Sequence, residues 1–157
     1  MIKFYEIGMY DNAVNVPYCT VPDTITNGVK NGYAVTYSEK TKTIALPTAD
    51  TAKSDGLAIV MNVIDKPETL DPDDYTVEVG EFARLFRLDL LANRLLVMND
   101  LAVTTAYADI AVDDTLVVGT DGKWVKETTL TGYAYYLTVI EKNTFCGNGL
   151  LVKVTKA

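Results

Sequence analysis

The sequence predicts an all-β protein: a small β-barrel or β-sandwich of about ten short strands, with an extended N-terminal arm and little helix. Three observations support this prediction. The apolar runs are short, and the longest, residues 57–64, is interrupted by Asn62. Threonine and tyrosine, which favour strands, occur 20 and 10 times. Turn sequences separate pairs of apolar runs, most clearly Gly-Thr-Asp-Gly at 119–122.

The first half of the chain predicts an arm followed by a hairpin and a central strand. Residues 2–7 look strand-like, but glycine and proline interrupt residues 8–22, so 1–28 is predicted to be an arm or edge segment. Residues 29–37 and 42–46 predict a β-hairpin, and 48–55 predict a loop or one helical turn. The central strand follows at 56–66 and ends at Pro67.

The second half repeats this order. Residues 82–88 favour a strand because extended segments flank them, although the apolar spacing over 81–91 also suits a helix. Residues 95–98 and 102–104 look extended. A hairpin is predicted at 115–126, a central strand at 132–142 and a closing strand at 150–154.

The two central strands resemble each other in sequence. Residues 56–66 and 132–142 both read Gly-x-Ala, four residues, Val-Ile, an acid and lysine. In each case a hairpin precedes the strand. The echo predicts a single β domain over 29–157 with two related halves, about 29–66 and 112–142. The alternative is that the two strands are similar only because core strands share the same apolar residue types.

Composition restricts the classes of partner. The chain has 157 residues, 48% of them apolar, and a net charge of −7. Because phosphate binding needs clustered lysine and arginine, which are scattered here, we expect no nucleic-acid partner. We expect no membrane partner, since no apolar run approaches about 18 residues. Cys19 and Cys146 are expected to be free thiols of a chain that folds in a reducing cytoplasm.

Catalytic and metal-binding patterns are missing from the sequence. The chain contains no histidine, which removes the usual general base and imidazole metal ligands. The remaining options for acid–base catalysis are carboxylate pairs such as Glu78 with Glu81, or Asp73 with Asp74. Because acidic runs usually form solvated surfaces, we expect no catalytic residue, no cofactor and no metal. The aromatic strand Tyr133, Tyr135 and Tyr136 suits either a contact surface or a core strand.

Four segments together resemble a known family. They are Val-Lys-Asn-Gly-Tyr-Ala-Val at 29–35, Asp-Gly-Leu-Ala-Ile-Val-Met-Asn-Val at 55–63, Val-Gly-Glu-Phe-Ala-Arg-Leu-Phe at 79–86 and Val-Asp-Asp-Thr-Leu-Val-Val-Gly at 112–119. This order is similar to that of the capsid decoration (cement) proteins of tailed bacteriophages. The likeness covers 29–126 best. It departs from the family at Asp113-Asp114, where a Gly-Asp pair is more usual, and over the first 28 residues.

The resemblance implies a structural virion protein that is not an enzyme. Such a protein folds in the host cytoplasm, docks on the outside of the capsid through contacts with the major capsid protein, and stabilises the shell. Self-association into a trimer or another ring would match the capsid lattice. The expected partner contacts are four residues of the arm and three of an acidic loop: Ile2, Phe4, Tyr5, Tyr10, Asp71, Asp73 and Asp74.

A second function remains open at this point. The Tyr-rich strand, Trp124 and the acidic loop together also suit a carbohydrate- or ligand-binding β module of a phage tail or another virion appendage.

Overall fold

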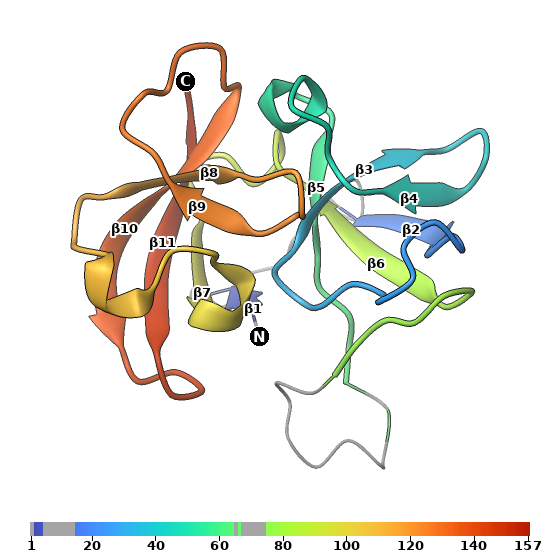
Figure 1. Cartoon of the computed structure of the whole chain (residues 1–157), viewed down its shortest axis with the longest axis horizontal. Helices are drawn as coiled ribbons and strands as arrows, with labels where there is room; N and C mark the ends of the chain where they lie inside the picture. The colour runs from blue at the N-terminus through green and yellow to red at the C-terminus, as the bar shows by residue number, and fades with distance from the viewer. Residues whose placement is uncertain (1, 5–14, 65, 67–74) are drawn as a thin grey trace.

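The computed structural model describes residues 2–4, 15–64, 66 and 75–157, and these form an all-β protein. A closed five-stranded barrel and a six-stranded sheet lie side by side (Figure 1). Helix is confined, in this part of the chain, to three single turns of 3-10 helix: η2 (Thr51–Lys53), η3 (Asp100–Ala102) and η4 (Tyr107–Asp109). The predicted fold class is therefore confirmed.

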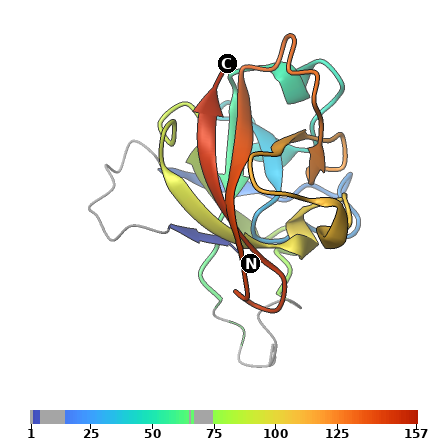
Figure 2. The same ribbon diagram turned by 90° about the vertical axis from the view of Figure 1, so that its left-hand side faces the viewer.

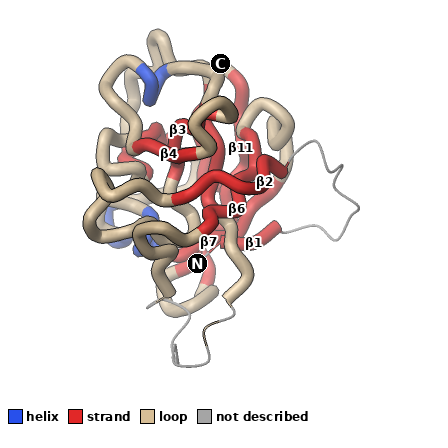
Figure 3. Tube along the Cα trace, turned by 90° about the vertical axis from the view of Figure 1, so that its right-hand side faces the viewer, coloured by secondary structure: helices blue, strands red, loops and turns tan. Residues whose placement is uncertain are grey.

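The barrel is built from the first half of the chain. Its strand order is β2-β4-β3-β5-β6, and β2 closes it by pairing antiparallel with β6 and parallel with β4 (Figure 3). The interior holds small and medium apolar side chains such as Cys19, Ala58 and Ala83, which suit a narrow barrel. The strands are β2 (Asn15–Thr20), β3 (Ala34–Ser38), β4 (Thr43–Ala45), β5 (Leu57–Val60) and β6 (Phe82–Arg87).

The sheet is built from the second half, together with the first strand of the chain. Its order is β1-β7-β11-β10-β8-β9, and the long β10–β11 hairpin runs through its middle (Figure 2). A bulge between Val139 and Glu141 shifts the β10–β11 register. The strands are β1 (Ile2–Phe4), β7 (Leu95–Asn99), β8 (Thr115–Val118), β9 (Trp124–Lys126), β10 (Tyr135–Asn143) and β11 (Gly149–Lys156).

The barrel and the second-half sheet share one pairing pattern. In the barrel β3 pairs with β4 and β5, and β6 pairs with β5 and β2. In the sheet β8 pairs with β9 and β10, and β11 pairs with β10 and β7. A parallel contact occurs in both: β2 meets β4 at Thr20–Thr43, and Val103, which follows β7 and η3, meets β9 at Trp124. The two echoing segments hold the same place in this pattern, as β5 and β10.

One hydrophobic core joins the two units. Leu57 and Ile59 of β5 point out of the barrel into this core, and Tyr135 and Leu137 of β10 enter it from the sheet. Ala58 and Val60 point into the barrel instead. Because both faces of β5 are buried, its sequence is a continuous apolar run. β10 buries only one face, so apolar and polar positions alternate along much of it.

The described N-terminal residues do not form an arm, although β1 is an edge strand of the sheet, as the alternative prediction of an edge segment has it. Residues 2–4 form a strand beside β7, and Ile2 enters the shared core with 4% of its surface exposed. Residues 15–20 are a barrel strand, and Val21, Ile25 and Val29 pack into the barrel. The prediction relied on the two prolines. Pro17 lies within β2, at a register irregularity between Val16 and Cys19.

Several predicted strand boundaries also shift. The strand predicted at 29–37 begins at Ala34, because Gly32 and Tyr33 complete a turn. The strand predicted from Gly132 begins at Tyr135 for the same reason. Ala102, predicted to be extended, belongs to η3. The strand prediction for 82–88 is confirmed, and the helical alternative there is wrong.

Candidate functional site

Three exposed apolar side chains belong to segments at one end of the barrel, where β5 ends and β6 begins. Val63 is 66% exposed, Phe82 61% and Val79 39%. Phe82 begins β6, where Ala83 and Leu85 point into the barrel, so Phe82 and Arg84 point outward. We call Val63, Val79 and Phe82 the barrel-end patch. Two more exposed apolar residues, Val112 and Ile140, belong to the second half of the chain.

Asparagine side chains fix the backbone beneath this patch. The Asn62 amide donates to the carbonyl oxygen of Phe82 at 2.8 Å and accepts from the backbone N–H of Arg84 at 2.7 Å. Asn62 thus extends the β5–β6 ladder by one step through its side chain, and Val63 is the next residue along the chain. The prediction noted Asn62 only as an interruption of an apolar run.

A charged cluster ties together the segments next to the patch. The ammonium of Lys66 donates to the carboxylate of Glu81 at 2.9 Å and to the carbonyl of Thr76 at 3.0 Å. Glu81 also accepts the backbone N–H of Glu78 at 2.7 Å. That backbone N–H and the Lys66 ammonium lower the pKa of Glu81, and the hydrogen bond to Glu81 raises the pKa of Lys66. The carboxylate of Glu81 therefore has a structural role, because one of its oxygens accepts both the Lys66 ammonium and the backbone N–H of Glu78.

The predicted partner-contact residues lie in different places: one is in the core, one is in an edge strand, and five are outside the described residues. Ile2 is a core residue, so it offers no free surface in this structure. Phe4 lies in β1. Five of the predicted residues fall outside the described part of the chain: Tyr5, Tyr10, Asp71, Asp73 and Asp74. What sequence reasoning missed was the barrel-end patch, and the only available signal was the outward position of Phe82 in an alternating strand.

The aromatic residues do not form the exposed row that one prediction allowed. Tyr135 is 4% exposed and belongs to the shared core. Trp124 is fully buried, and its indole Nε1–H donates to the carbonyl of Gly32 at 2.9 Å. Tyr133 and Tyr136 are half-buried, and the ammonium of Lys53 lies 5.4 Å from the centre of the Tyr133 ring. The Tyr-rich strand is therefore mainly structural.

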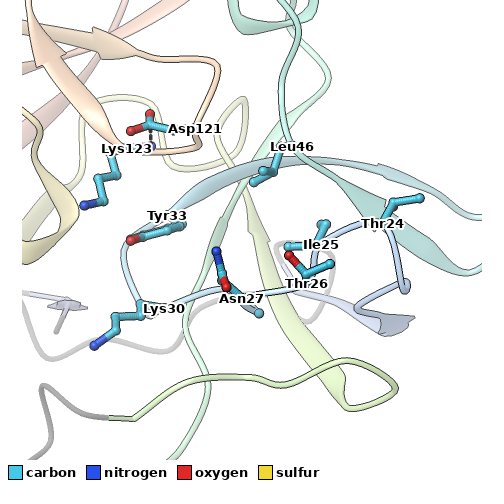
Figure 4. A pocket seen from close by; sticks show the side chains of 10 residues that line it. Thr24, Ile25, Thr26, Asn27, Lys30, Tyr33, Leu46, Asp121 and Lys123 are labelled. Atoms are coloured by element: carbon cyan, nitrogen blue, oxygen red, sulfur yellow. Dashed lines mark hydrogen bonds between the residues drawn. The ribbon is translucent and has the colours of Figure 1, made fainter.

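A pocket of about 380 Å³ lies where the barrel meets the β8–β9 turn (Figure 4). We call it the junction pocket. The barrel contributes the segment after β2 and the start of β3, and the sheet contributes Asp121 and Lys123. Most lining residues carry a polar side chain, although apolar atoms supply the larger part of the wall surface. The pocket is lined by Thr24, Ile25, Thr26, Asn27, Gly28, Lys30, Tyr33, Leu46, Asp121 and Lys123.

Close backbone contacts hold the two walls of the junction pocket together. The N–H of Ala34 donates to the carbonyl of Gly122 at 2.7 Å. Gly122 has φ of +80°, and a Cβ there would lie 2.9 Å from the carbonyl oxygen of Ala34. Glycine therefore permits both the turn and the close approach of the two units. The Trp124 hydrogen bond to Gly32 adds a second tie between the same segments.

No cluster of metal-binding side chains was found among the described residues. Within the same residues, no helix is long and apolar enough to cross a membrane. Cys19 and Cys146 are not joined by a disulfide; the first thiol is buried and the second is half-buried. Burial, with a smaller contribution from Glu39, raises the pKa of the Cys19 thiol, which disfavours the reactive thiolate.

Comparison with known proteins gave no match: no family model, no curated protein and no solved structure is significantly similar to this chain.

Proposed function

We propose that this chain is a structural virion protein that docks on the outside of a phage capsid, stabilises the shell and catalyses no reaction. The observation that supports docking is the barrel-end patch, where Val63 and Phe82 each expose more than 60% of their surface. Large exposed apolar side chains that lie together commonly mark an interaction surface. The sequence resemblance to capsid decoration proteins supports the choice of partner.

The patch has the composition of a docking site. Val63, Val79 and Phe82 provide an apolar centre, and the exposed Arg84 and the half-buried Glu81 provide charged neighbours. Protein interfaces commonly have such an apolar core and polar rim. Covering an exposed valine or phenylalanine side chain is worth about 1.5–3 kcal/mol, so two of them can anchor a contact that further polar groups complete.

The proposed partner is the major capsid protein, and the proposed location is the outer surface of the virion. Many copies would then sit at equivalent lattice points. Contacts between neighbouring copies, as a trimer or another ring, would add to the affinity of each copy for the shell.

Capsid binding tests this proposal. The purified chain is mixed with undecorated capsids assembled from the major capsid protein of the same phage, and bound protein is measured after sedimentation. We expect saturable, stoichiometric binding and a higher capsid melting temperature. Val63→Asp places a charge in the patch and should weaken binding at least about tenfold, because a charge buried in an apolar contact costs more than 1.4 kcal/mol.

Val112→Asp is the matched control. Val112 is 51% exposed but lies in the second half of the chain, so the same substitution leaves the patch intact. Binding by this variant should equal that of the unmodified chain. Absence of binding at micromolar protein would refute the proposed function, and equal loss in both variants would refute the role of the patch.

A further inference from the structure

The junction pocket is preformed and lies apart from the barrel-end patch. Its two walls are tied by the hydrogen bonds from Ala34 to Gly122 and from Trp124 to Gly32. The β8–β9 turn is itself closed by a bond from the N–H of Gly119 to the carbonyl of Lys123 at 2.7 Å. Ligand binding would therefore cost little conformational entropy, because the pocket walls are already held in place.

One end of the pocket is cationic. In Figure 4 the ammonium groups of Lys30 and Lys123 lie on either side of the Tyr33 hydroxyl. Lys123 forms no ion pair with any described residue, and its ammonium lies 5.8 Å from the centre of the Tyr33 ring. In a chain with a net charge of −7, this is a local site for a negative group.

Asp121 does not neutralise this end of the pocket. One of its carboxylate oxygens accepts the backbone N–H of Lys123 at 3.0 Å, and the other accepts the hydroxyl of Thr104 at 3.3 Å. The carboxylate therefore serves first to hold the β8–β9 turn. Each oxygen keeps a further lone pair that can accept a hydroxyl group from a ligand.

The opposite wall offers neutral hydrogen-bonding groups. Thr24, Thr26 and Asn27 are exposed and line the pocket next to Ile25 and Leu46. Hydroxyl and amide groups beside apolar side chains suit a ligand that carries several hydroxyl groups on a carbon ring. The volume of about 380 Å³ lies near the lower limit for small-molecule sites, so it suits one ring rather than a chain of rings.

We propose that the junction pocket binds an acidic monosaccharide. Its carboxylate lies beside the ammonium group of Lys123, its ring lies against Tyr33, and its hydroxyl groups bond to Asn27 and Asp121. A simple anion would use only the cationic end of this pocket, and a neutral sugar would use only the opposite wall. This inference does not depend on the proposed function, because it needs neither a capsid nor the barrel-end patch.

Nuclear magnetic resonance with the isotope-labelled full chain tests the proposal. Methyl β-glucuronide is titrated, with methyl β-glucoside as the neutral counterpart and acetate as the carboxylate alone. We expect saturable shifts of amide signals from residues 24–33 and 119–124, with Kd in about the millimolar range. The glucoside and acetate should each bind at least about fivefold more weakly, since each lacks one set of contacts.

Two lysine variants separate a site from general charge attraction. Lys123→Met should weaken glucuronide binding about tenfold, because it removes a charged hydrogen-bond donor and keeps the length of the side chain. Lys40→Met is the control, since Lys40 is exposed in the β3–β4 turn and does not line the pocket. The proposal is overturned by the absence of saturable shifts, by acetate binding as tightly as the glucuronide, or by equal effects of the two variants.

Discussion

Asn31 and Asn62 are joined by two hydrogen bonds that imitate a pair of neighbouring strands. The Asn31 amide donates to the carbonyl of Asn62 at 3.0 Å, and its oxygen accepts the backbone N–H of Asn62 at 2.7 Å. Asn62 in turn uses its own amide to bond the backbone of β6 at Phe82 and Arg84. Two side chains therefore continue the sheet where the β5 backbone has left it, directly beneath the barrel-end patch.

Replacing Asn31 with alanine should destabilise the protein by about 2–4 kcal/mol, because both backbone groups of Asn62 lose their partner and Asn31 is only 7% exposed. Asn31→Asp keeps the acceptor but loses the donor, so its effect should be intermediate. Urea unfolding followed by circular dichroism measures both free energies.

The control for this prediction is Asn27→Ala. Asn27 is exposed and forms no hydrogen bond within the described residues, so its loss should change the unfolding free energy by no more than about 0.5 kcal/mol. If Asn31→Ala were as mild as Asn27→Ala, the asparagine ladder would not support the barrel end.

Alanine substitutions at Gly122 and Gly80 distinguish the cost of backbone strain from the cost of a steric clash. Both have φ near +80°, but a Cβ at Gly122 would lie 2.9 Å from the Ala34 carbonyl, and one at Gly80 would have no neighbour within 4 Å. Gly80→Ala should cost about 1–2 kcal/mol from backbone conformation alone. Gly122→Ala should cost about 1–3 kcal/mol more, because the two units must move apart. Thermal and urea unfolding of the two variants give the difference; equal costs would contradict the close contact.

The shared core predicts that the barrel and the sheet unfold together. Trp124, the single tryptophan, is buried at the junction of the two units, so its fluorescence reports on their contact, whereas circular dichroism reports on all strands. The two signals should give one urea midpoint. Ile59→Ala removes a fully buried side chain of the shared core and should lower both midpoints equally, at a cost of about 2–5 kcal/mol. Separate midpoints would show that the units are independent.

The sequence was sufficient to predict the local elements of this fold. The extended segments on both sides of 82–88 and the Gly-Thr-Asp-Gly turn are local signals in the sequence, and the two predictions match β6 and the β8–β9 hairpin. The echo between 56–66 and 132–142 also reflects structure. β5 and β10 hold equivalent places in the two pairing patterns, but identical residues of the echo differ in burial: Val139 is fully buried, whereas its counterpart Val63 is 66% exposed.

Features that depend on distant partners could not be read from the sequence. Nothing in β2 indicates that it closes the barrel, because its partners β4 and β6 lie far along the chain. Phe82 and Phe86 share one strand face, but Phe86 is 5% exposed and Phe82 61%, since the shared core reaches only one of them. The junction pocket likewise requires residues separated by about ninety positions, such as Lys30 and Lys123.

Asp114 predicts how stability depends on pH. Its carboxylate pairs with the ammonium of Lys126 at 2.7 Å and accepts the N–H of Ala111 at 2.6 Å, and these two groups, in that order of importance, lower its pKa. A lowered folded-state pKa gives stability that is present above the unfolded-state value, near 3.9, and is lost as pH falls through the folded-state pKa. Asp114→Asn should therefore cost about 1–2 kcal/mol at pH 7, and this cost should shrink below about pH 4.

The neighbouring Asp113 provides a control with the same change of charge. Asp113 is exposed, and its φ of +69° suits asparagine as well as aspartate, so Asp113→Asn removes a charge without removing a contact. Its unfolding free energy should stay within about 0.5 kcal/mol of the unmodified chain at pH 7 and at pH 3. Urea unfolding at several pH values measures both variants. A cost for Asp114→Asn that is the same at pH 3 and pH 7 would show that the loss comes from shape and not from the ion pair.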